Sequence, residues 1–223
     1  MSKFEVIIPV VNIELANLLL VSIERNTIQP QRIIIINNSK EVYKPLPKDL
    51  PIEMFFSETG RVNESINLGI SKVSKDCDYV SILNDDLILG PYFFDRIAGI
   101  FDRIGDCAVA CPQQVFDISE LITGPPALVQ MMKREGPAMT FRKSVLDQIP
   151  TFPHKIIQTF HIDDWFWVWT RYKLKRIWCK DLGNTVYHKV GASVRKLGLG
   201  VHKRPESHQW NKILKELGQG VEF

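Results

Sequence analysis

Four consecutive isoleucines, at positions 33–36, restrict the possible folds of this chain more than any other feature of its sequence. An unbroken run of β-branched residues favours a strand that is buried on both faces, as in the parallel sheets of α/β proteins. Apolar runs predict further strands at residues 4–11, 52–56 and 79–83, and helical spacing predicts helices at residues 13–25 and 62–73. This alternation predicts an α/β fold with an open, mainly parallel sheet that is flanked by helices and joined by right-handed crossovers.

The second half of the chain carries weaker signals, which we interpret as a continuation of the same domain. The expected elements are a helix at 91–104, a strand at 107–111, a loop region at 116–135 with a helix at 128–133, a strand at 137–141, a helical turn at 143–148, an aromatic helix at 163–172, a strand at 185–188 and a terminal helix at 206–217. The Gly-rich, basic residues 191–200 are expected to form a mobile segment.

The composition is that of an ordinary globular protein and excludes several classes. Hydrophobic residues make up 45% of the chain and charged residues 24%, which argues against a disordered or fibrous protein. The net charge of +3 does not call for a nucleic acid partner, and no apolar run reaches the ~20 residues of a membrane-spanning helix. The four cysteines form no C-x-x-C pair and are expected to be buried thiols. We therefore expect a soluble, cytoplasmic protein with no nucleic acid partner and no integral membrane contact.

Three polar clusters follow predicted strands of the first half, at residues 11–12, 37–39 and 84–86. Each cluster alone could be a simple turn, because Asn and Asp are common turn residues. Ligands of an open α/β sheet, however, bind outside the carboxyl ends of its strands, and all three clusters occupy that edge. The sequence therefore favours one shared site over three unrelated turns.

The cluster Asn84-Asp85-Asp86 carries two adjacent carboxylates. A hard divalent cation takes carboxylate oxygens and leaves coordination positions open for substrate phosphates. Two neighbouring carboxylates can divide this work, so that one holds a metal ion and the other a sugar hydroxyl. The alternative interpretation is that Asp85 or Asp86 only caps a turn or a helix.

Further candidates lie in the second half. Asp163 and Asp164 open the aromatic helix, where they either stabilise the helix N-terminus through its dipole or act as a general base. Trp165 and Trp169 lie one turn apart, which suits either a sugar face or a packed core. His188 ends an apolar strand and is either a structural histidine or a metal ligand.

Several short motifs, taken together, resemble those of GT-A fold glycosyltransferases, specifically of the large family 2 type. The motifs are Pro9-Val10-Val11-Asn12 at the end of the opening strand, Asn37-Asn38-Ser39 after the second strand, Gly60-Arg61-Val62-Asn63, the D-x-D-like Asn84-Asp85-Asp86, Gly136-Pro137-Ala138-Met139, Ile162-Asp163-Asp164-Trp165 and Tyr187-His188-Lys189. Each motif is short, but their shared order makes the resemblance specific. It covers most of the chain and implies a single-domain, Rossmann-like GT-A fold.

The resemblance implies a role for each motif in binding the donor. It places the nucleotide base among Pro9, Val10, Val11, Asn37 and Arg61. Asn37 stands where the family usually has an Asp, and the Gly that normally follows is missing.

The resemblance also implies how the reacting groups are held. Asp86 and His188 correspond to the metal ligands, and Asn84 or Asp85 to the ribose contact. Asp164 corresponds to the catalytic base, with Asp163 in the place of the family's Glu.

The implied activity is metal-dependent transfer of a sugar from a nucleotide diphosphate donor, expected to be a UDP-sugar, to a carbohydrate or other hydroxyl acceptor. The cofactor is expected to be Mn²⁺ or Mg²⁺, and a single base with in-line attack predicts inversion. Residues 1–105 are expected to form the nucleotide-sugar-binding half, residues 106–190 the donor-sugar and acceptor half, and residues 191–223 a basic mobile segment with the C-terminal helix. We expect basic residues between 195 and 204 to close over the diphosphate as a lid.

Two other functions fit parts of the same pattern. A non-catalytic nucleotide-sugar-binding or assembly module would use the same fold without turnover. A nucleotidyltransferase would need a Gly-rich loop after the first strand, but residues 10–14 contain no glycine. The oligomeric state has no sequence signal.

Overall fold

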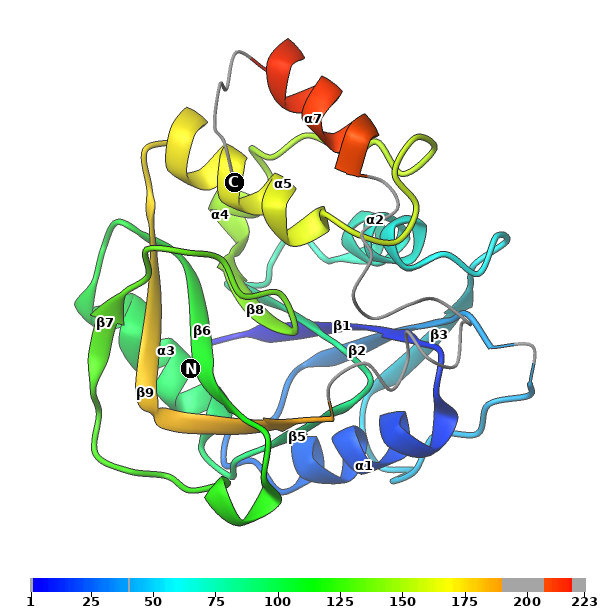
Figure 1. The fold of residues 1–223 in the computed structure, drawn as a ribbon. Helices are drawn as coiled ribbons and strands as arrows, with labels where there is room; N and C mark the ends of the chain where they lie inside the picture. The colour runs from blue at the N-terminus through cyan, green and yellow to red at the C-terminus, as the bar shows by residue number, and fades with distance from the viewer. Residues whose placement is uncertain (1, 40, 190–206, 218–223) are drawn as a thin grey trace.

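The computed structural model describes residues 2–39, 41–189 and 207–217, so the predicted mobile segment and lid lie outside the described residues. The described residues form one continuous nine-stranded sheet in the order β3-β2-β1-β4-β8-β6-β9-β5, with β7 paired to β9 (Figure 1). The strands are β1 (Phe4–Val10), β2 (Arg32–Asn37), β3 (Ile52–Phe56), β4 (Tyr79–Leu83), β5 (Leu87–Leu89), β6 (Cys107–Val115), β7 (Leu128–Gln130), β8 (Ala138–Arg142) and β9 (Ile177–His188).

The first four strands confirm the parallel sheet expected from the isoleucine run. β1 pairs in parallel with both β2 and β4, and β2 pairs in parallel with β3. The second half is mixed: β8 runs antiparallel to β4 and β6, whereas β6 and β9 are parallel. The sheet therefore keeps the carboxyl ends of β1, β2 and β4 at one edge.

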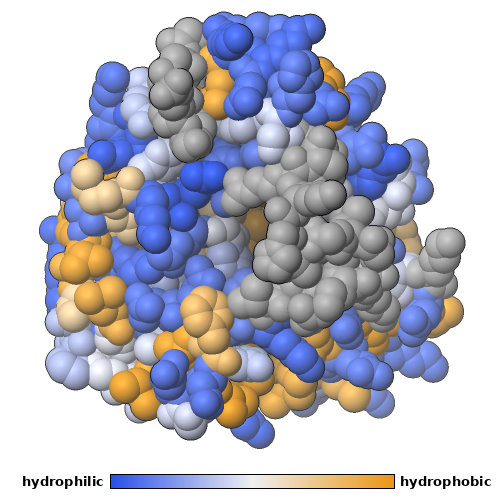
Figure 2. Space-filling view, viewed as in Figure 1, coloured by the Kyte–Doolittle hydropathy of each residue, from blue (hydrophilic) through white to orange (hydrophobic). Residues whose placement is uncertain are grey.

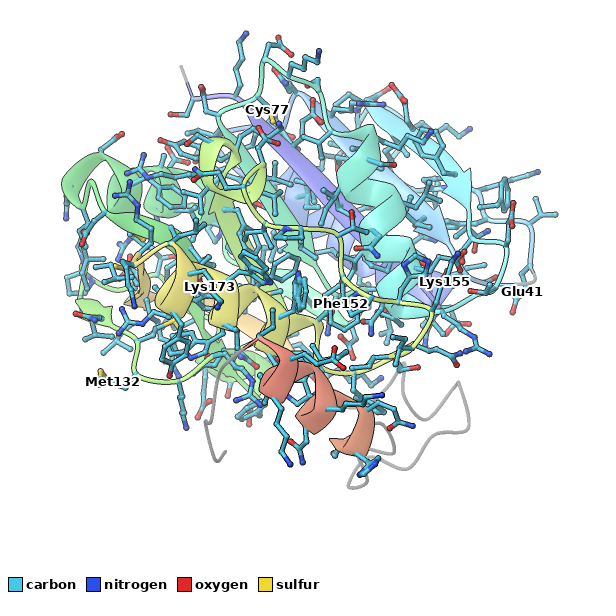
Figure 3. The ribbon with its side chains drawn as sticks, turned by 90° about the horizontal axis from the view of Figure 1, so that it is seen from above. Glu41, Cys77, Met132, Phe152, Lys155 and Lys173 are labelled. Carbon is cyan, nitrogen blue, oxygen red and sulfur yellow. The ribbon has the colours of Figure 1, made fainter. Side chains whose placement is uncertain are left out.

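Helices cover both faces of the sheet, and Figure 1 shows α1 on the opposite face from α2, α5 and α7. The helical segments are α1 (Ile13–Glu24), α2 (Val62–Lys72), α3 (Phe93–Arg103), α4 (Lys143–Leu146), α5 (Ile162–Val168) and α7 (Ser207–Glu216), with the 3-10 turn η1 (Ile118–Glu120) and the π-helical turn η2 (Trp169–Lys173). Seen from above, α7 lies beside α5 (Figure 3), and the Trp210 ring of α7 stacks on His161 with centroids 5.3 Å apart.

Alternate residues of each central strand supply two hydrophobic cores. On β1, Val6 and Ile8 pack with α1 and α3, whereas Ile7 packs on the other face with α2 and α5. Side chains of a strand point alternately to its two faces, so a strand that is apolar at every position must be covered on both sides. The isoleucine run follows the same division, with Ile33 and Ile35 on one face and Ile34 and Ile36 on the other.

Some expectations for the second half are wrong in type or length. The helix expected at residues 128–133 is the strand β7 at residues 128–130, because its backbone pairs antiparallel with residues 179–181 of β9. β9 begins at Ile177, eight residues before the expected strand, and β6 extends to Val115. The short strand β5 was not expected.

One group of exposed apolar side chains lies between residues 116 and 132 and comprises Phe116, Ile118, Ile122, Val129 and Met132. Figure 2 shows hydrophobic colour along the left and lower edges of the viewed face, where Figure 1 places β7 and the loop after β6. Met132, which follows β7, is 81% exposed and lies at the periphery in Figure 3. Within the described part of the chain, no helix has the length and apolar character needed to cross a bilayer.

Candidate active site

The polar clusters that follow β1, β2 and β4 meet at the carboxyl edge of the sheet. The backbone N–H of Asn38 donates to the carbonyl of Val10 at 2.8 Å, which joins the ends of β1 and β2. The N–H groups of Val11 and Asn12 both donate to Asp85 Oδ2, each at 2.7 Å, which joins the ends of β1 and β4. The geometry therefore brings together the three clusters that the sequence placed at one edge.

Asp85 is held by the backbone rather than directed at open space. Asp85 is only 2% exposed, and it accepts the N–H groups of Val11 and Asn12, the two residues between β1 and α1. Burial, and secondarily the charge of Asp85, raise the pKa of the Tyr43 hydroxyl above its ordinary value, so Tyr43 lies near this carboxylate. Asp85 therefore organises the end of β1.

Asp86 has a different environment, because its carboxylate faces His188. The register of β5 and β9 pairs Leu87 with His188, and the N–H of Lys189 donates to the carbonyl of Asp86 at 3.0 Å. Asp86 Oδ1 lies 3.4 Å from His188 Nε2. Among the described residues no group donates a hydrogen bond to this buried oxygen. A carboxylate oxygen and an imidazole nitrogen that face each other in this way suit a shared cation.

The other nitrogen of His188 is fixed by a polar chain. His188 Nδ1 lies 3.1 Å from Gln114 Oε1, and Gln114 Nε2 donates to Glu135 Oε2 at 3.0 Å. The other oxygen of Glu135 contacts the ammonium of Lys180. Gln114, Glu135 and Lys180 were not sequence candidates.

Only Asp86 and His188 form the candidate metal site. Across the described ranges, no group of three or more His, Cys, Asp or Glu side chains converges in a way that could hold a metal ion. Mg²⁺ and similar cations are commonly bound through one or two carboxylates, with water and substrate phosphates filling the other positions. A two-residue site with one undonated oxygen therefore fits a cation that is bound together with a diphosphate.

The residues expected around the nucleotide base differ in their exposure to solvent and in their hydrogen bonds. The side chain of Asn37 is 1% exposed, accepts the N–H of Ser39 at 2.8 Å and donates to the carbonyl of Glu41 at 3.2 Å. It thus closes the turn after β2. Arg61 is exposed at the start of α2, whereas Pro9 and Val10 are buried in β1.

Asp163 and Asp164 begin α5, but only Asp163 is partly open to solvent. The Asp164 side chain is 1% exposed, contacts the Arg134 guanidinium and accepts a hydrogen bond from His161 Nδ1 at 2.5 Å. The Asp163 side chain is 24% exposed, with Oδ2 at 3.7 Å from Arg134 Nε. His161 adopts φ 70°, and this left-handed turn sets the start of α5. Arg134 and His161 were not identified from the sequence.

Gly136 connects the acidic pair to the carboxyl edge of β4. A Cβ at this position would lie 3.1 Å from both Cβ and Oδ2 of Asp163, so the absence of a side chain allows α5 to approach. The next residue, Pro137, accepts the N–H of Asn84 at 2.9 Å. The two candidate regions therefore lie on either side of residues 136–137.

The aromatic residues of α5 belong to the core. Trp165 and Trp167 are 6% and 5% exposed, and the indole of Trp165 donates to the carbonyl of Pro150 at 2.9 Å. Phe152, labelled in Figure 3, packs edge-on against Trp165 with ring centroids 5.7 Å apart. For Trp165 these contacts support core packing, whereas Trp169, the other member of the predicted pair, is half-buried, with its ring centroid 5.7 Å from that of Trp165.

Structure comparison relates this arrangement to glycosyltransferases. TarS 1-349 from S. aureus in complex with UDP-GlcNAc superposes with a TM-score of 0.70 and 16% identity, over 99% of this chain and 68% of that one. GalNAc-T7 with UDP, GalNAc and Mn²⁺ gives a TM-score of 0.65 and 10% identity, over 83% of this chain and 43% of that one. A second crystal structure of S. aureus TarS 1-349 gives a TM-score of 0.60 and 14% identity, over 88% of this chain and 63% of that one. No protein-family model and no curated protein matches the sequence.

These similarities identify the fold as GT-A, the glycosyltransferase fold that the sequence motifs predicted. The chain spans about two thirds of the length of TarS 1-349 and less than half of that of GalNAc-T7.

Proposed function

We propose that this chain is a metal-dependent glycosyltransferase that moves a sugar from a UDP-sugar to a hydroxyl acceptor, with inversion at the anomeric carbon. The observation that carries the proposal is the buried Asp86 Oδ1, 3.4 Å from His188 Nε2, at the carboxyl edge of a GT-A sheet. Similar structures that contain UDP-GlcNAc, or UDP with GalNAc and Mn²⁺, support the donor class and the metal.

Asp86 and His188 would hold the cation, which is Mn²⁺ or Mg²⁺. Such an ion, when bound, neutralises charge that develops on the leaving diphosphate. Because one of the two ligands is an imidazole, the site favours Mn²⁺ over the strictly oxygen-seeking Mg²⁺. The lid expected from basic residues between 195 and 204 falls outside the described residues.

The nucleoside is proposed to bind along the ends of β1 and β2. Pro9, Val10 and Val11 would line its base together with Asn37, and Arg61 has an exposed side chain that can reach toward it. Asn84 is half-buried beside Asp85 and is the better placed of the two to meet the ribose, because Asp85 already accepts two backbone N–H groups.

Asp164 is the proposed base that takes the proton of the acceptor hydroxyl, with Asp163 beside it at the mouth of the site. Asp164 has to give up or share its contact with Arg134 before it accepts that proton. Asp163 is the more open carboxylate and would orient the acceptor. Residues 136–137 place this pair next to the end of β4, where the donor sugar would lie.

Turnover of UDP-sugars in the presence of Mn²⁺ tests the proposal. We expect Asp164→Asn to lower the transfer rate by about 10²–10⁴-fold while UDP and Mn²⁺ still bind, as loss of a general base does. Asp147→Asn changes an exposed aspartate that lies just after α4, beyond the other end of β8 from residues 136–137, and is the matched control. A full rate of sugar transfer by Asp164→Asn would reject Asp164 as the base. The absence of transfer from every UDP-sugar tested would reject the proposed glycosyltransferase activity.

A non-catalytic nucleotide-sugar-binding module is the second candidate. The observation that favours it is that Asp164 is buried between Arg134 and His161. These contacts already engage the carboxylate that would have to act as the base. A panel of nucleotide diphosphates and their sugars, with and without Mn²⁺, separates the two functions by thermal shift and turnover. Binding without transfer or donor hydrolysis identifies the module.

A further inference from the structure

A chain of polar side chains leads from Lys180 through Glu135 and Gln114 to His188. We propose that these three are positioning residues that fix the tautomer of His188, so that the Nε2 lone pair points at Asp86. This inference rests on the proposed function insofar as a cation between Asp86 and His188 would make use of that lone pair.

The chain starts with the contact between Lys180 and Glu135. Lys180 is 8% exposed, and its ammonium contacts Glu135 Oε1 and lies 3.5 Å from Gln113 Oε1. The ammonium can only donate, so Glu135 Oε1 accepts from Lys180, and Glu135 Oε2 is the acceptor that faces Gln114.

An acceptor on Glu135 decides which way the Gln114 amide points. The amide has one donating and one accepting end, so its NH₂ group must face Glu135 Oε2, at 3.0 Å. Its carbonyl oxygen then faces His188 Nδ1, at 3.1 Å. Because that oxygen only accepts, the proton of the neutral imidazole must be on Nδ1.

A proton on Nδ1 leaves Nε2 as an acceptor directed at another acceptor. His188 Nε2 and Asp86 Oδ1 are 3.4 Å apart. Without a proton or a cation between them, two such atoms gain nothing from this approach. An outer partner that fixes ring orientation and tautomer is a usual feature of metal-binding histidines.

The elements that carry this chain suit it to hold a fixed geometry. Gln114 lies on β6 and both Lys180 and His188 lie on β9, and these two strands pair in parallel with Gln114 opposite Val186. Glu135 comes from the segment just before β8. Residues mounted on paired strands are positioned more precisely than residues on loops.

The test combines ring ¹⁵N NMR of His188 with Mn²⁺ titration in the presence of UDP, using Gln114→Leu. In the unmodified chain we expect the Nδ1–H tautomer. In Gln114→Leu we expect a mixed population of tautomers and about 10–100-fold weaker Mn²⁺ binding. Gln130→Leu, at an exposed position on β7, is the matched control and should change neither property.

Glu135→Gln provides a second variant that does not touch His188. It removes the charge that orients the Gln114 amide, so we expect the tautomer preference to weaken although Gln114 is present. An unchanged His188 tautomer in both variants would overturn the inference. So would an imidazole protonated on both nitrogens in the unmodified chain, because Asp86 and His188 would then be a simple ion pair.

The two readouts separate this inference from the proposed function. If the NMR results agree with the prediction but Mn²⁺ does not bind with UDP, the metal site is wrong and the positioning role stands. If Mn²⁺ binds equally well to Gln114→Leu and to the unmodified chain, the positioning role is wrong and the metal site stands.

Discussion

Asp85 and Asp86 are adjacent in the sequence but have different surroundings in the structure. Asp85 accepts the N–H groups of Val11 and Asn12, so its charge stabilises the end of β1. Asp86 presents Oδ1 to His188, and no described group donates to that oxygen. The first carboxylate is thus tied to folding, whereas the second is available to a ligand.

Substitution of each aspartate should therefore affect a different property. Asp86→Asn should weaken UDP-dependent Mn²⁺ binding by more than the roughly 10–100-fold that loss of an outer-shell partner costs. Its melting temperature should not fall, because an amide at this position can donate to His188. Isothermal titration and thermal denaturation measure the two effects.

Asp85→Ala, unlike Asp86→Asn, should lower the stability of the fold. It leaves the buried N–H of Val11 and the partly buried N–H of Asn12 without their acceptor, at a cost of about 1–3 kcal/mol for each one that stays unsatisfied. Denaturant titration measures this loss. A stable Asp85→Ala protein, or a destabilised Asp86→Asn protein, would contradict the division between the two residues.

The sequence was sufficient to select Asp86 and His188, because each follows a clear strand and belongs to a motif. It was not sufficient to select Gln114 or Glu135. Their contacts depend on the register of β6 and β9 and on the path of the segment before β8, and neither has a local pattern. Polar residues that act through another side chain have no characteristic spacing of their own.

At the level of elements, α2 lies close against β1, and Gly69 makes this approach possible. A Cβ at Gly69 would lie 2.4 Å from Cγ2 of Ile7, a fully buried residue in the middle of β1. A side chain there would have to push the helix away from the strand whose carboxyl end forms the site. The packing of α2 therefore depends on a residue without a side chain.

Gly69→Ala should lower the free energy of unfolding by about 1–3 kcal/mol, the usual cost of overpacking a core. Gly99→Ala is the matched control, because it lies inside α3 and its Cβ would meet no atom within 4 Å. This control should raise stability by about 0.5–1 kcal/mol through helix propensity. Urea denaturation compares the two, and equal effects would reject the close approach.

The part of β9 that the sequence did not predict contains buried charges. Lys180 and Asp181 interrupt the apolar pattern of β9, which hid the first part of this strand. Both side chains are buried and each has a partner: Lys180 contacts Glu135, and Asp181 pairs with Arg96 at 2.6 Å. Partners that are distant in the sequence satisfy these charges, so local hydrophobicity could not reveal a strand here.

At the scale of the whole molecule, both faces of the sheet are covered, and the four cysteines are free and buried, as expected. Burial raises the pKa of the Cys77 thiol to about 12 and raises that of Cys111 above its ordinary value. The hydrogen bond with Cys107 lowers the pKa of the Cys179 thiol, but Cys179 is only 1% exposed. Because all four thiols are buried, the folded protein should resist thiol reagents. Labelling should appear only as the protein unfolds in urea, and rapid labelling under native conditions would contradict the described packing.

The sequence predicts more of the overall fold than of the candidate site. The four parallel strands follow from continuous apolar runs, and the order of the motifs predicted the GT-A fold. The burial of Asp164 could not be predicted, because Arg134 reaches it from a segment without regular structure.

The central claim is that Asp86 and His188 together bind a divalent cation beside a nucleotide diphosphate. The most direct measurement is an anomalous difference map at the manganese absorption edge, from crystals grown with Mn²⁺ and UDP. The account predicts one strong peak within bonding distance of an Asp86 oxygen and of His188 Nε2, next to the diphosphate. Manganese bound at Asp163 and Asp164 instead, or UDP bound with no manganese at Asp86, would contradict it.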